Sequence, residues 1–178
     1  MHLNSFLIMK SIILLLLLLF LYAGISSQEI NQTIKDNKTG ELILLGKCNK
    51  LAFYQEPFKK WYENEYNTYM PAETIIKEFK KFLNDKIKII VFFGSWCEDS
   101  QKLLPQFIKT MDIVGYTPNT IELIAVDHNF KEDNNCINYK VNKVPTFIFY
   151  NGDKEIGRIV ESVSSSIEKE ILKILKKQ

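Results

Sequence analysis

The chain has 178 residues, 46% of them apolar and 25% charged, which is the composition of a globular protein rather than a disordered one. The formal net charge is only +2, and lysines are interspersed with acidic residues along the chain. A solvated surface of this kind does not favour a nucleic-acid partner. The length fits one domain once a targeting segment is removed.

Residues 1–27 have the pattern of a secretory signal peptide. Lys10 precedes an apolar run with unbroken leucines from 14 to 19, and small residues follow at Ala23, Gly24 and Ser26. The run is shorter than the ~20 residues that cross a bilayer comfortably, which argues against a permanent anchor. We therefore expect cleavage near Gln28 and a periplasmic or secreted protein, with membrane contact only through an uncleaved signal.

Residues 28–70 are expected to form an N-terminal extension. Residues 28–40 are polar and aperiodic, which predicts a flexible lead, and the short apolar run 41–46 predicts a strand. Aromatic side chains then recur at helical spacing between Pro57 and Pro71, which predicts an amphipathic helix over 57–70. The aromatic stripe is a candidate ligand platform, but a stripe of this kind is usually core, and we favour the core interpretation.

Residues 71–178 alternate helical and strand patterns. Apolar positions on one side predict a helix over 75–83, and the β-branched run 87–93 predicts a strand buried on both faces. The remaining predicted elements are a helix that starts at Cys97 and contains Pro105, a buried strand at 121–127, a short helix at 134–139, strands at 147–150 and 155–160 around an Asn-Gly turn, and a C-terminal helix at 164–177. This order predicts an α/β fold with a central mixed sheet flanked by helices.

Three cysteines follow the predicted signal: Cys48, Cys97 and Cys136. An oxidising compartment permits disulfides, but an odd number leaves at least one thiol free, transiently bonded or joined to another molecule. Cys97 lies at a strand-to-helix turn, where unpaired backbone N–H groups and the helix dipole favour an anionic thiolate. We predict that Cys97 is the reactive thiol and that Cys48 and Cys136 are packed.

Two segments, IIVFFGSWCEDS at 89–100 and VPTFIFYNGDKEIGRIV at 144–160, together resemble the thioredoxin superfamily over residues 71–178. The sequence is most similar to secreted bacterial thioredoxin-like proteins that carry Trp-Cys-x-Asp-Ser and end on Gly-Arg-Ile-Val-Glu. The resemblance implies a thioredoxin fold with the N-terminal extension added. It also implies that Pro145 is a cis proline beside the Cys97 sulfur, that Val144 exposes its backbone to an extended substrate, and that Thr146 begins the next strand.

Two departures from the family pattern concern the second half of the reaction. Ser100 replaces the resolving cysteine, and a serine hydroxyl does not break a mixed disulfide. The buried acid that the resemblance implies in the preceding strand corresponds to Val91. That acid helps to deprotonate a resolving thiol, so the loss of both is self-consistent.

A third departure is the charge around the site. Glu98 and Asp99 follow Cys97 directly, and Glu161 corresponds approximately to a family glycine beside the site. Negative charge opposes thiolate formation, so we expect a moderately reactive thiol. With Trp96, these acids complete the predicted lining of the site. His128, at the end of a predicted strand, is interpreted as a loop residue.

The leading functional hypothesis is monothiol thiol–disulfide exchange through Cys97, in a CxxS site with no cofactor or metal. Its partners would be proteins or small thiols that carry a thiol or a disulfide. One alternative is a non-catalytic module that binds partner segments at the Pro145 edge, and another is an enzyme that uses Cys136 or Cys48 as a distant resolving thiol. A one-cysteine peroxidase is disfavoured, because Gly94 stands where such a site has threonine.

Overall fold

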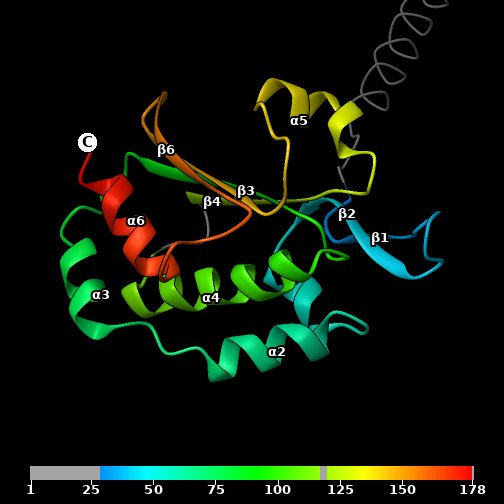
Figure 1. The fold of residues 1–178 in the computed structure, drawn as a ribbon, viewed down its shortest axis with the longest axis horizontal. Coiled ribbons are helices and arrows are strands. Elements are labelled where there is room, and N and C mark those ends of the chain that lie inside the picture. Colours follow the sequence, from blue (N-terminus) through cyan, green and yellow to red (C-terminus); the bar gives the residue numbers. More distant parts are fainter. Residues whose placement is uncertain (1–28, 117–119, 178) are drawn as a thin grey trace, which may run out of the picture.

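The computed structural model of the protein describes residues 29–116 and 120–177, and the predicted signal lies outside these residues. Its centre is a mixed sheet with the strand order β1-β2-β4-β3-β5-β6 (Figure 1). Only β3 and β4 pair in parallel, and every other neighbouring pair is antiparallel. The strands are β1 (Gln32–Lys35), β2 (Leu42–Cys48), β3 (Ile87–Phe93), β4 (Ile121–Ala125), β5 (Thr146–Asn151) and β6 (Lys154–Val160).

Helices cover both faces of this sheet. The long helix α4 packs against one face with α2, α3 and α6, while α5 lies over the other (Figure 1). The helices are η1 (Lys50–Tyr54), α2 (Lys59–Thr68), α3 (Glu73–Phe79), α4 (Glu98–Val114), η3 (Phe130–Glu132), α5 (Asn134–Asn138) and α6 (Ile167–Leu175). This confirms the predicted mixed sheet flanked by helices. No helix within the two described ranges is long and apolar enough to span a bilayer.

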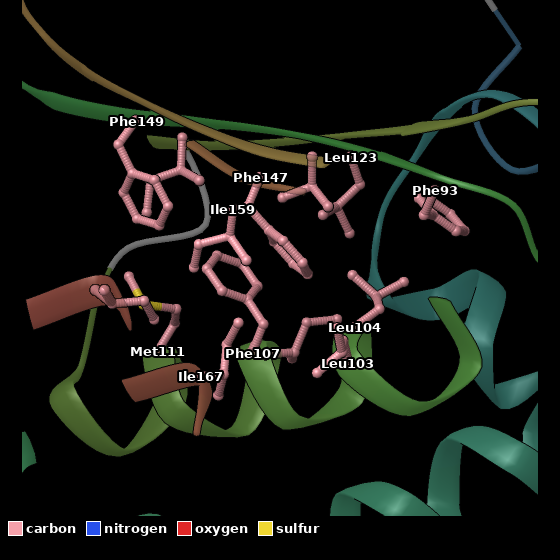
Figure 2. Close-up of a cluster of buried hydrophobic side chains, with 14 of the residues drawn as sticks. Phe93, Leu103, Leu104, Phe107, Met111, Leu123, Phe147, Phe149, Ile159 and Ile167 are labelled. Atoms are coloured by element: carbon pink, nitrogen blue, oxygen red, sulfur yellow. The ribbon is translucent and has the colours of Figure 1, made fainter. Parts of the chain in front are cut away.

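The core forms where α4 meets the sheet. Fully buried side chains from α4, among them Leu104 and Phe107, face Phe93, Leu123 and Phe147 from three strands (Figure 2). The 3.6-residue period of α4 sets one apolar stripe against the sheet. The core therefore holds the start of α4 against the end of β3, which is where Cys97 lies.

The aromatic stripe of the N-terminal extension belongs to this same core. Phe58 and Tyr62 are 2% and 1% exposed, and Tyr62 stacks on Phe53 with ring centroids 5.0 Å apart. The core interpretation of the stripe is confirmed. The helix itself begins later than predicted, since Pro57 lies in a turn and α2 starts at Lys59.

The flexible lead predicted for residues 28–40 is wrong over most of its length. Residues 32–35 form β1, which pairs antiparallel with β2, and Ile34 lies opposite Ile43. The turn between them is built by the Asp36 carboxylate, which accepts hydrogen bonds from the Lys38 N–H (3.2 Å) and the Thr39 hydroxyl (2.8 Å). A short exposed edge strand has little apolar periodicity, so this hairpin lacks a strong local signal.

Candidate active site around Cys97

Cys97 is the N-cap residue of α4, directly after the loop that leaves β3. Its backbone is extended (φ −96°, ψ 122°), and its carbonyl accepts the first helical hydrogen bond, from Gln101 N–H at 2.9 Å. The side chain is partly exposed. The residue therefore stands at the N-terminal end of the helix, where the first backbone N–H groups have no helical partner.

The segment before β5 lies opposite Cys97 and forms the other side of the site. The Val144–Pro145 bond is cis, and the Cys97 Sγ lies 3.4 Å from the Val144 carbonyl oxygen, to which the thiol donates. The Glu161 N–H donates to the Pro145 carbonyl at 2.7 Å, and the Thr146 hydroxyl donates to the Lys143 carbonyl at 2.7 Å. The structure thus brings Cys97, Val144 and Pro145 together as expected.

The expected charge pattern needs one correction. Glu161 forms an ion pair with Lys143, so this carboxylate is largely neutralised where we expected a net negative charge. Glu98 and Asp99 are exposed and form no ion pair within the described residues. They are the acids that directly follow Cys97 along the chain, in the first turn of α4.

Ser100 has a structural partner of its own. It is fully buried, and its hydroxyl oxygen accepts the Gly94 N–H at 3.2 Å, so it holds the loop that carries the cysteine. Val91 lies in the middle of β3, fully buried between Leu123 and Phe147. Neither position provides a second thiol or an acid behind Cys97.

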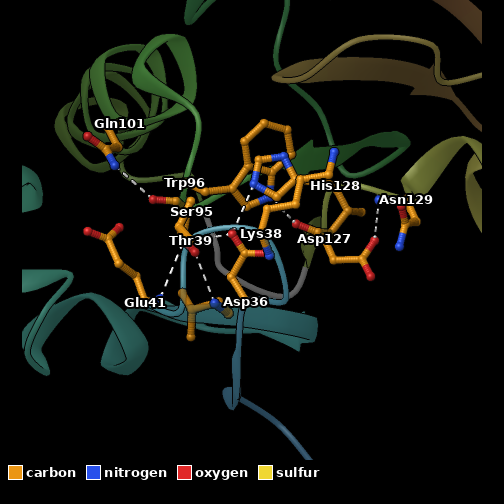
Figure 3. A network of polar contacts seen from close by, with 12 residues as sticks. Asp36, Lys38, Thr39, Glu41, Ser95, Trp96, Gln101, Asp127, His128 and Asn129 are labelled. Atoms are coloured by element: carbon orange, nitrogen blue, oxygen red, sulfur yellow. Dashed lines mark hydrogen bonds and ion pairs between the residues drawn. The ribbon is translucent and has the colours of Figure 1, made fainter.

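Trp96 is held by residues that the sequence did not identify as part of the site. Its indole N–H donates to the Val126 carbonyl at 2.8 Å, and its ring stacks on His128 with centroids 3.8 Å apart (Figure 3). The imidazole Nε2 lies 3.1 Å from a carboxylate oxygen of Asp36, which is only 5% exposed. His128 is in a loop, as predicted, but it supports the tryptophan beside Cys97.

One further contact attaches the N-terminal extension to this loop, and another attaches α4 to it. The Ser95 hydroxyl accepts the Leu44 N–H at 2.9 Å, and the Gln101 side chain donates to the Ser95 carbonyl at 2.8 Å (Figure 3). Position 94 requires glycine because the Trp96 ring lies close to the backbone there. A Cβ atom at this position would lie 2.7 Å from the ring. The glycine that disfavours a peroxidase therefore also makes room for the indole.

The position of His128 near the site could have been predicted from the sequence. His128 comes just after β4, and β4 is parallel to β3, so the carboxyl ends of both strands meet at the edge where Cys97 lies. Asp36 could not have been identified in this way, because the sequence of its hairpin is polar and aperiodic.

The other two cysteines are poor nucleophiles in this structure. Burial raises the pKa of Cys48 to about 12, and burial, with the charges of Asp133 and Asp127, raises that of Cys136 to about 12. Cys48 packs near Met111, fourteen residues along α4 from Cys97, a helix length of about 20 Å. No described group of three or more His, Cys, Asp or Glu side chains is arranged to hold a metal ion.

Comparison with known proteins places this geometry in a family. The thioredoxin family model matches residues 71–175. Thioredoxin H-type from Brassica oleracea is 26% identical over 94 residues, which is 51% of this chain and 69% of that protein. A probable protein disulfide-isomerase ER-60 from Schistosoma mansoni is 32% identical over 68 residues, 38% of this chain but only 14% of its own length.

A solved structure of a protein of unknown function from Pseudomonas aeruginosa has a TM-score of 0.49 at 14% identity, covering 66% of this chain and 81% of that one. The family match covers more than half of the chain, from α3 to α6, and includes both Cys97 and Pro145. The chain therefore belongs to the thioredoxin family.

Proposed function

We propose that this protein carries out monothiol thiol–disulfide exchange through Cys97. The observation that carries the proposal is a partly exposed sulfur at the start of α4, 3.4 Å from the Val144 carbonyl, with a buried serine at position 100. The names of similar proteins, thioredoxin and protein disulfide-isomerase, support the same chemistry. We also propose that the chain is of the secreted bacterial type with the Trp-Cys-x-Asp-Ser motif.

The reaction has two steps. The Cys97 thiolate attacks one sulfur of a substrate disulfide, the substrate S–S bond breaks, and the other sulfur leaves as a thiolate. This forms a mixed disulfide between Cys97 and the substrate. A thiolate from a second molecule then attacks the mixed disulfide and releases Cys97. The external thiol is required because Ser100 has no sulfur to offer.

The partner segment would run along the cis-proline edge. Val144 precedes β5, and its N–H donates no hydrogen bond within the described part of the chain. An extended peptide could accept that N–H while its sulfur meets Cys97, in the manner of strand addition. The same contact would serve a purely binding module, so reactivity has to be measured directly.

Trapping through Cys97 tests the function. Lysate proteins are captured by the wild type and by Cys97→Ser, and eluted with a reducing agent. Many disulfide-linked partners that depend on Cys97 would support exchange, and their absence would favour the binding module. Cys136→Ser and Cys48→Ser are the matched controls. If disulfide turnover is lost in either of these variants, the replaced cysteine is a distant resolving thiol. Cys136 is the better placed of the two, because it shares an apolar cluster with Cys97.

Export is a separate part of the proposal. The basic–apolar–small pattern of residues 1–27 supports a periplasmic or secreted location. Mass spectrometry of the exported protein should show a mature chain that begins near Gln28. An intact Met1 on the exported protein would contradict cleavage.

A further inference from the structure

A groove of about 570 Å³ lies beside Trp96, between the N-terminal extension and the cysteine loop. Its apolar lining includes Leu42, Phe58, Trp61 and Trp96. Leu42 is half exposed. Most of the lining residues precede residue 71, so the groove is built mainly by the part of the chain outside the family match.

The groove shares lining residues with the loop that carries Cys97. Ser95, Trp96 and Gln101 line it, and these residues flank Cys97 in the chain. Figure 3 shows Glu41, Ser95 and Gln101 on the side of Trp96 opposite His128. A peptide whose cysteine meets Cys97 can therefore place neighbouring residues in the groove.

The charge of the groove is one-sided. Glu41 and Glu56 line it, both are exposed, and neither forms an ion pair within the described residues. No lysine or arginine is among its lining residues. A negative field of this kind attracts cationic segments and slows the approach of anionic ones.

We propose that this groove binds an extended segment of the protein substrate that carries a lysine or arginine beside an apolar side chain, next to the cysteine that reacts with Cys97. The apolar side chain packs against the aromatic lining, and the cation lies between Glu41 and Glu56. This proposal rests on the proposed exchange function and names its substrate class.

The test uses pairs of peptides that differ in one residue. Each peptide carries a single cysteine activated as a disulfide with thiopyridine, flanked by leucine and by either arginine or glutamate. Attack by Cys97 releases thiopyridone, whose absorbance gives the rate. At low ionic strength we expect the arginine peptide to react about 100-fold faster than the glutamate peptide. Each of the two carboxylates, at about 6 Å, speeds the cationic peptide about threefold and slows the anionic one about threefold.

Variants assign the preference to the groove. Glu41→Gln with Glu56→Gln should bring the rate ratio close to one. Asp85→Asn with Asp153→Asn removes the same charge at the opposite end of the sheet, where β3 begins and β5 ends, and should leave the ratio unchanged. Equal rates with neutral dithiodipyridine would show that Cys97 itself is intact in every variant.

A ratio that is unaffected by Glu41→Gln with Glu56→Gln, or equally affected by the control pair, would overturn the groove proposal. Calorimetric binding of peptides with serine in place of cysteine separates the two proposals. If Cys97 reacts with none of the disulfides, exchange is refuted. The groove is then judged by whether the serine peptide with arginine binds more tightly than the one with glutamate, and equal binding would refute it.

Discussion

Replacing Ser100 with cysteine should convert a thiol that remains bonded to its substrate into one that releases it. Residues three apart at the start of a helix share a face with Cβ atoms about 5–6 Å apart, so a small shift brings a cysteine at position 100 within disulfide reach of Cys97. The new thiol would attack the mixed disulfide from within the same molecule. Even an effective concentration of about 10 mM exceeds 0.1 mM external thiol about 100-fold. We expect mixed disulfides to decay faster by at least that factor.

The substitution has a structural cost that can be measured separately. The Ser100 hydroxyl accepts the Gly94 N–H at 3.2 Å in a fully buried position, and sulfur is a weaker acceptor. Loss of this bond should lower the free energy of unfolding by about 1 kcal/mol. Ser100→Ala is the matched control, because it loses the same hydrogen bond and introduces no thiol. It should share the destabilisation and keep the long-lived mixed disulfide.

The assay follows a preformed mixed disulfide between Cys97 and a labelled peptide by acid quenching and mass spectrometry without reduction. A second variant adds Val91→Asp to Ser100→Cys, which provides a proton acceptor behind the new thiol and should accelerate release further. Val91 is fully buried, so this variant needs its folding verified first. If the wild type already releases peptide as fast as Ser100→Cys, the monothiol mechanism is refuted.

Three further predictions follow from burial and contacts. Alkylation at neutral pH should be fastest at Cys97, because burial raises the pKa of Cys48 and Cys136 from 9.0 to about 12, and faster labelling of either in single-cysteine variants would contradict this. His128→Ala should cost about 0.5–1.5 kcal/mol in urea unfolding, because it removes the ring stacked on the tryptophan before Cys97; an unchanged midpoint would show that the stack contributes nothing. Burial alone would raise the pKa of Glu168. Hydrogen bonds to its carboxylate, of which the one from a tyrosine has the largest effect, instead hold this pKa below its ordinary value of 4.5. A carboxyl with a lowered folded-state pKa stabilises the fold above pH 4.5 and loses this effect as the pH falls through that folded value, so Glu168→Gln should flatten the acid limb of the unfolding free energy against pH.

Local patterns in the sequence were sufficient to predict the strand, turn and helix around Cys97. The apolar run of β3 matches its predicted bounds of 87–93, and the helical period after Cys97 places that residue at the start of α4. These features are readable because each depends on residues close together in the chain. The cis bond at Pro145, beside the Cys97 sulfur, came from the family resemblance; the structure has the cis bond and places the Val144 carbonyl of that bond 3.4 Å from the sulfur.

Contacts between segments distant in the chain could be identified only from the tertiary structure. Asp36 reaches His128 across 92 positions of the chain, and Lys143 neutralises Glu161 across 18. Neither pairing leaves a periodic signal, because a charged residue gives the same sequence pattern whether or not a partner lies beside it. The N-terminal hairpin is ordered by pairing with β2 and by the contacts of Asp36, so an apparently polar lead became a support for Trp96. The sequence identified Cys97 as the candidate nucleophile, while packing between remote elements decided what surrounds it.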